Sequence, residues 1–128
     1  MKKASFFVII ACVIFALSAN VYADQLNGKW HCTANGYKFE LDISQNGETI
    51  AGGMKDLSYA KGSMSYIRGK VIGHKVQFVR TLPSRPKWKQ TFEGFVFFGQ
   101  QSGQGMAGTF GKGSNTQESG WFAIRSQP

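Results

Sequence analysis

Beyond residue 23, three side chains have the types that nucleophilic or general-base catalysis needs: the thiol of Cys32 and the imidazoles of His31 and His74. His31 and Cys32 are neighbours, so on a strand they point to opposite faces and do not pair. His74 follows Gly73 in a predicted tight turn. No residues have the spacing of a metal site, such as Cys-x-x-Cys or His-x-x-x-His. The sequence therefore predicts a protein that is not an enzyme and that needs no metal or cofactor.

Basic side chains are concentrated in one part of the chain. The sequence has 15 Lys and Arg against 7 Asp and Glu, and no acidic residue lies between Asp56 and Glu93. The basic residues of that interval are Lys61, Arg68, Lys70, Lys75, Arg80, Arg85, Lys87 and Lys89. A long stretch of one sign of charge attracts anions, although scattered surface charge that keeps the protein soluble explains it equally well.

The segment 83–88 has the most specific pattern in this basic stretch. It brings Arg85, Lys87 and Trp88 together, and its two prolines stiffen the loop and so lower the entropy lost on binding. We expect these three side chains to be the principal ligand contacts.

Three further aromatic residues, Tyr37, Tyr59 and Trp121, are predicted near the same rim from the directions of their strands. Rings beside cations suit a ligand with a flat or apolar body and an acidic group. The alternative is that the rings only cap the hydrophobic core.

The elements that position these residues are predicted to be strands. Alternation of apolar and polar residues, as in 37–44, is typical of a half-buried strand, and Asn46-Gly47 is a strong hairpin signal. The pattern predicts no helix and eight strands, at 28–34, 37–45, 48–54, 62–72, 75–82, 88–98, 105–111 and 119–126. Short strands with frequent turns and glycines indicate an all-β fold, a small antiparallel up-and-down barrel, with a sandwich as the alternative closure.

Loop lengths predict that the two ends of this barrel differ. In a meander, the odd and even connections lie at opposite ends. The odd connections are mostly long, at 33–36, 55–61, 83–87 and 112–118, and the even ones are tight or glycine-rich, at 46–47, 73–74 and 99–104. We therefore expect an open, loop-rich end that carries the 83–87 loop and a closed end that carries Trp30 and Arg125.

Residues 1–23 have the pattern of a cleaved secretory signal peptide. Lys2 and Lys3 precede an apolar run, and Val21-Tyr22-Ala23 matches a cleavage site. Cleavage after Ala23 would leave one domain at 24–128 and lower the net charge from +8 to +6, because Lys2 and Lys3 are removed. The signal peptide predicts an exported protein, periplasmic or extracellular. No other segment is apolar for long enough to span a membrane as a helix. Export also makes nucleic acid an unexpected partner.

The opening Gly28-Lys29-Trp30, together with Arg125 in the last strand, resembles the calycin superfamily of lipocalins, fatty-acid-binding proteins and avidins. The resemblance implies a barrel base in which Gly28 precedes Trp30 and Arg125 packs across the tryptophan ring. The avidin branch is most similar in layout. Its biotin-binding Asn and Ser are replaced by Cys32 and Gly36, so the resemblance implies no biotin site.

The run Phe95-Val96-Phe97-Phe98 places apolar residues on both faces of one strand. One face fills the barrel and the other needs cover, so Phe95 and Phe97 predict a homo-oligomer, as avidin-like association also implies. The alternative is a local bulge that turns neighbours inward.

These observations predict an exported, non-catalytic barrel that binds a small amphiphilic or anionic ligand at its open end. The alternative is a secreted interaction protein, an inhibitor or a factor that binds an anionic surface polymer such as a polysaccharide, through the basic 83–89 loop. A purely structural role is the third interpretation. An internal pocket would favour the first hypothesis, and a filled barrel with a projecting loop would favour the second.

Overall fold

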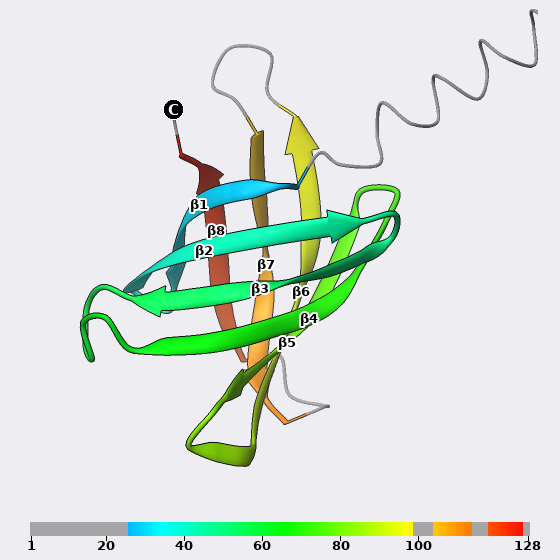
Figure 1. Ribbon diagram of the computed structural model, residues 1–128. Helices are drawn as coiled ribbons and strands as arrows, with labels where there is room; N and C mark the ends of the chain where they lie inside the picture. Colours follow the sequence, from blue (N-terminus) through cyan, green and yellow to red (C-terminus); the bar gives the residue numbers. More distant parts are fainter. Residues whose placement is uncertain (1–25, 99–103, 114–117, 127–128) are drawn as a thin grey trace, which may run out of the picture.

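Eight antiparallel strands follow one another around a closed barrel in this computed structural model, which describes residues 26–98, 104–113 and 118–126 (Figure 1). The strands are β1 (Gly28–Ala34), β2 (Tyr37–Asn46), β3 (Thr49–Asp56), β4 (Met64–Ile72), β5 (Lys75–Leu82), β6 (Arg85–Phe98), β7 (Gln104–Lys112) and β8 (Ser119–Arg125). Each strand pairs with the next, and β8 pairs with β1. The predicted all-β, up-and-down barrel is confirmed, and the sandwich alternative is wrong.

Alternation of apolar and polar residues builds the barrel as expected. On β2, for example, Phe39, Leu41 and Ile43 are buried, whereas Lys38 and Asp42 are exposed. Burying the inward side chains of all eight strands supplies the hydrophobic core, since burial of a large apolar side chain contributes about 1.5–3 kcal/mol.

Glycines allow the closely spaced backbones of this small barrel. Gly94 on β6 faces Gly108 on β7. A Cβ atom at Gly108 would lie 1.8 Å from the carbonyl oxygen of Glu93 and 2.5 Å from Cα of Gly94. The pair therefore permits an approach of two strands that any larger residue prevents.

The connections differ in part from the expected lengths. Pairing of Ala34 with Tyr37 leaves a two-residue turn between β1 and β2, and pairing of Leu82 with Arg85 does the same between β5 and β6. The longer connections at this end join β3 to β4 and β7 to β8. The end therefore has two long connections and two tight turns.

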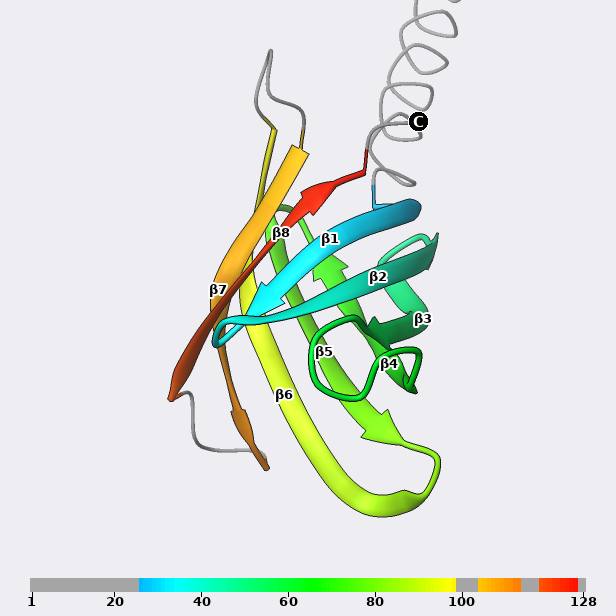
Figure 2. The ribbon, with the colours of Figure 1, turned by 90° about the vertical axis from the view of Figure 1, so that its left-hand side faces the viewer.

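The β5–β6 hairpin projects past the rest of the barrel at this end (Figures 1 and 2). Strand β6 begins at Arg85, whereas the sequence predicted a loop as far as residue 87. Thr81 pairs with Lys89 and Leu82 with Arg85, so residues 86–88 form a bulge on β6. A bulge bends a strand and re-aims its side chains, which explains how a proline-containing segment joins the sheet edge.

The predicted signal peptide at 1–23 lies outside the described residues, so its cleavage stays a prediction. Among the residues that the structure describes, no helix has the length and apolar character needed to cross a membrane.

Candidate functional site

The barrel is sealed at the end where β1 begins and β8 finishes. The guanidinium of Arg125 lies over the ring of Trp30, 4.5 Å from its centroid, so the contact implied by the calycin resemblance is present. The indole N–H of Trp30 donates a 3.0 Å hydrogen bond to the carbonyl of Leu26, and Arg125 donates to the carbonyl of Asn27. Gly28 has a φ of 120°, and a Cβ there would lie 3.1 Å from Nη1 of Arg125. Glycine therefore suits both the backbone and the space at this position.

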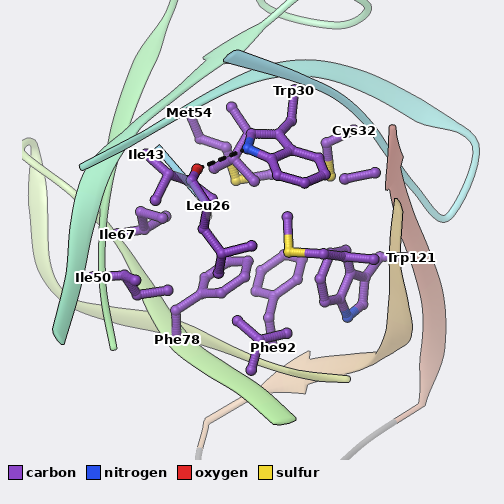
Figure 3. Close-up of a cluster of buried hydrophobic side chains, with 14 of the residues drawn as sticks. Leu26, Trp30, Cys32, Ile43, Ile50, Met54, Ile67, Phe78, Phe92 and Trp121 are labelled. Atoms are coloured by element: carbon purple, nitrogen blue, oxygen red, sulfur yellow. Dashed lines mark hydrogen bonds between the residues drawn. The ribbon is translucent and has the colours of Figure 1, made fainter. Parts of the chain in front are cut away.

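Aromatic side chains fill the centre of the barrel (Figure 3). Phe78, Phe92 and Phe110 form a stack with successive centroid distances of 4.8 Å, and Trp121 meets the first two edge-on. The indole N–H of Trp121 donates to the carbonyls of Glu93 and Thr109. Trp121 is thus a buried core residue, and its predicted place at the open rim is corrected: its side chain points inward from the start of β8.

A small pocket remains at the opposite, open end, with a volume of about 150 Å³. We call it the mouth pocket. It is lined by Ala34, Asn35, Tyr37, Phe39, Arg80, Gln90 and Phe110. Phe110, the last ring of the aromatic stack, also borders this pocket. The barrel is therefore a filled core with a shallow mouth, rather than a deep ligand cavity.

Arg80 is the cation of the mouth pocket. It continues the inward alternation of Val76 and Phe78 on β5, so its side chain enters the barrel. Its Nε donates a 2.7 Å hydrogen bond to Oγ of the buried Ser65, and its Nη1 donates a 2.9 Å bond to Oε1 of Gln90. Its guanidinium also lies 4.8 Å from the ring centroid of Phe39. Three neighbouring strands thus hold one charge in a defined position.

Two donor groups in this pocket lack an acceptor. None of the described residues accepts a hydrogen bond from Nη2 of Arg80 or from the side-chain NH₂ of Gln90. A half-buried donor that makes no hydrogen bond to protein is costly unless water or a ligand satisfies it. The pocket therefore offers the charged N–H donors of Arg80 and the neutral N–H donors of Gln90 to an anionic group that carries oxygen atoms.

Asp56 offsets part of this positive charge from the end of β3. Its carboxylate accepts hydrogen bonds from the backbone N–H groups of Ser58 and Tyr59, at 2.9 and 3.0 Å. Burial raises the pKa of Asp56, but these backbone donors and the charge of Arg80 outweigh it, so the pKa lies below its ordinary value. Burial lowers the pKa of Arg80, and the charge of Asp56 opposes that change. Arginine nevertheless stays protonated at any physiological pH.

Aromatic rings stand at the rim beside the mouth pocket. Tyr37 and Tyr59 meet edge-on with centroids 6.4 Å apart, and Tyr59 is 85% exposed. Tyr37 lines the mouth pocket with Arg80, so its ring presents apolar surface beside that cation.

The hairpin residues predicted as contacts lie at the same end but occupy different positions. Arg85 and Lys87 are exposed on the projecting hairpin, whereas Trp88 is half-buried. The ring of Trp88 lies 5.5 Å from the guanidinium of Arg80. The ring of Trp88 therefore contacts the mouth cation, and its predicted role as a ligand contact stays a prediction.

The sequence pattern groups Arg80 with the surface cations of its acid-free stretch, although its place two residues after Phe78 indicates an inward side chain. Its partners Ser65 and Gln90 come from other strands, and the registers that align them cannot be inferred from spacing alone.

Residues with catalytic or metal-binding chemistry stay apart. His31 is exposed, Cys32 is buried, and Nδ1 of His74 lies 3.2 Å from the carbonyl oxygen of Val96. Burial raises the pKa of the Cys32 thiol to about 12. Within the described ranges, no group of three or more His, Cys, Asp or Glu side chains is arranged to hold a metal ion.

The sequence matches no known protein family and no curated protein in these two comparisons.

Proposed function

We propose that this protein is a non-catalytic binding barrel that takes the acidic group of a small amphiphilic or anionic ligand into its mouth pocket. The proposal rests on Arg80, which Ser65 and Gln90 hold in place and whose Nη2 donates to none of the described residues. A carboxylate, sulfate or phosphate oxygen would accept from those donors, and charge-assisted hydrogen bonds of this kind are the strong ones.

Pocket size constrains the ligand. Pockets that enclose a drug-sized molecule have volumes of about 300–1,000 Å³, and the mouth pocket has about 150 Å³. The pocket therefore fits a head group, and the apolar body of the ligand lies outside, against Tyr37 and Tyr59. An amphiphile therefore suits the site better than a compact anion, because its head group fills the pocket and its apolar body contacts the tyrosine rings outside.

The predicted export and family relationship belong to the same proposal. A periplasmic or extracellular binding protein agrees with the signal-like segment at 1–23. The stacking of Arg125 on Trp30 and the eight-stranded meander support a calycin-like origin.

Octanoate and octanol test the proposal as a matched pair, because they share a chain length and differ in charge. We expect octanoate to bind more tightly than octanol, as measured by isothermal titration calorimetry. Arg80→Met should weaken octanoate binding at least tenfold, since losing a hydrogen bond to a charged group costs about 1.5–3 kcal/mol. Lys70→Met, which removes one exposed positive charge from β4, should leave the affinity unchanged. Equal effects of the two variants would refute the site, and circular dichroism checks that both are folded.

A second candidate function is an interaction protein that uses the β5–β6 hairpin as an inhibitor or surface-binding factor. The filled barrel interior and the projection of this hairpin, with Arg85 and Lys87 exposed on it, are the features expected for this hypothesis, whereas the donors of Arg80 in the mouth pocket favour the first (Figure 2). Replacement of both residues by alanine separates the two functions. It should abolish binding to a macromolecular partner, and it should weaken octanoate binding less than Arg80→Met does and mainly at low salt, because exposed charges are screened.

A further inference from the structure

A second concentration of positive charge lies on the outer wall of the barrel, separate from the mouth pocket. Two hollows there have volumes of about 630 and 330 Å³, and both are bordered by Val79 and Lys89. Because they share these residues, they adjoin across the outward faces of β4 to β7. We call them together the outer groove, whose charged lining residues are Arg68, Lys87, Lys89 and Lys112.

Three cations of the outer groove, Arg68, Lys87 and Lys89, lack an acidic partner among the described residues. None of the described residues that line either hollow is acidic. Arg68, Lys87 and Lys89 are exposed, and their side chains form no ion pair or hydrogen bond with any part of the chain that the structure describes. The nearest acid along β6 is Glu93, whose carboxylate accepts from Gln77 at 3.3 Å. Like charges gathered in a concave surface focus a field that attracts an anionic partner.

Strand register determines the spacing of these charges. Lys89 pairs with Thr81, which pairs with Tyr66, while Arg68 pairs with Val79 in the adjacent row. Neighbouring strands are about 4.8 Å apart and alternate residues about 6.7 Å, so two strands and two residues put the Cα atoms of Arg68 and Lys89 about 12 Å apart. Lys87 lies farther along β6, on the bulge. A single small anion can contact at most two of these long side chains at once, whereas a chain that carries repeated anionic groups can contact all three.

The uncharged lining of the groove suits sugar rings. Val79 and Thr81 form an apolar and weakly polar floor between the cations, and Tyr66, 55% exposed, stands at one side. The face of a tyrosine ring packs against the C–H groups of a sugar, while its hydroxyl hydrogen-bonds. A single-stranded nucleic acid would need a series of stacking rings, and Trp88, the other ring at the groove, is beside Arg80 instead.

We propose that the outer groove binds a linear acidic polysaccharide, with its anionic groups on Arg68, Lys87 and Lys89 and a sugar ring against Tyr66. The site is distinct from the mouth pocket, since Arg80 points into the barrel and lines neither hollow. The inference does not depend on the proposed ligand of the mouth; it rests on the surface-binding alternative, with which it shares Lys87, and names a substrate class for it.

Fluorescence anisotropy with a labelled alginate oligosaccharide, a chain of uronic acids, tests the groove. We expect saturable binding that weakens with added salt, and no binding of a neutral dextran oligomer of the same length. Lys87→Gln with Lys89→Gln should weaken alginate binding at least tenfold. The matched control is Lys38→Gln with Lys55→Gln, which removes two exposed charges from β2 and β3 and should change the affinity less than twofold.

The outcomes separate this inference from its alternatives. Equal weakening by the two double variants would mean that only net charge matters and would overturn the site. Absence of alginate binding, or tighter binding of a single-stranded oligonucleotide, would overturn the polysaccharide. Arg80→Met should leave alginate binding within twofold, so that the groove and the mouth pocket can fail independently.

Discussion

Cys32 shows how burial on one strand face controls the chemistry of a side chain. The thiol lies two residues after Trp30, is 1% exposed, and has a pKa raised to about 12 by burial, against the opposing charge of Arg80. We predict that iodoacetamide at pH 8 labels it only as fast as the protein unfolds, because the thiolate is the reactive form. Alkylation followed by mass spectrometry measures this rate. Labelling of the native protein as fast as of the urea-unfolded chain would contradict the prediction, as would a dimer lost on reduction.

Asp56 predicts how stability depends on pH. Its pKa is lower in the folded protein than its ordinary value of 3.8, so the ionised carboxylate stabilises the fold above that pH. This contribution is lost as the pH falls from 3.8 through the folded pKa. Asp56→Asn should therefore destabilise the protein by about 1 kcal/mol at neutral pH, and the difference should close as the pH falls below the folded pKa. Urea unfolding between pH 2.5 and 7 measures it. A difference that is constant with pH would show that the charge of Asp56 has no role.

At the scale of elements, the closed end depends on the start of β1. Trp30 is fully buried, donates to Leu26 and packs beneath Arg125. We predict that Trp30→Ala lowers the free energy of unfolding by about 3–5 kcal/mol, the range for removing a buried aromatic side chain. Trp30→Phe, which keeps a ring but loses the N–H donor, should cost less. Denaturant unfolding measures both, and a loss below about 1 kcal/mol for the alanine variant would mean that this end is not an anchor.

Strand positions could be predicted well because alternation is a local property. The bounds of β1 and β5 agree with the expectation at both ends. The start of β6 was predicted three residues late, since two prolines suggested a loop where the strand instead carries a bulge. The candidate site could be predicted only in part. Strand direction predicts which end of the barrel carries the site and that Tyr37 lies there. The contacts of Arg80 instead depend on the relative register of β4, β5 and β6, which no single segment encodes.

Trp121 illustrates the same limit. Its place at the start of β8 gave the correct end of the barrel, but whether a terminal ring points inward depends on its neighbours. Phe78 and Phe92 provide an aromatic surface, and backbone carbonyls of β6 and β7 accept its N–H. Contacts with β5, β6 and β7 therefore determine that the ring of Trp121 points into the barrel.

For the whole molecule, the outward surface of β6 to β8 is unusually apolar. The register aligns Phe95 with Ala107 and Phe122 in one row, and Phe97 with Gly105 and Ile124 in the next. Phe95 is 62% exposed, and the three other large side chains of these rows are also exposed. A contiguous apolar patch of this kind marks an interaction surface, so we expect two copies of the chain to pair through this face.

Analytical ultracentrifugation tests that association. The protein should sediment as a dimer at micromolar concentration, and Phe95→Ser with Phe122→Ser should sediment as a monomer. Tyr66→Ser, which removes an equally exposed ring from β4, is the control and should leave the dimer intact. A monomeric parent protein, or a dimer that survives the double substitution, would contradict the predicted interface.

Arg80 is proposed to hold the acidic group of a ligand in the mouth pocket. Nuclear magnetic resonance observes the Nε–H of arginine directly, and Arg80→Met identifies the signal. During titration with octanoate, we predict a saturable shift of the Arg80 Nε–H signal together with backbone signals of Asn35 and Tyr37, and no such shift with octanol. Octanoate shifts confined to the Phe95 and Phe122 face, or an Arg80 signal that stays unchanged at saturation, would contradict the account.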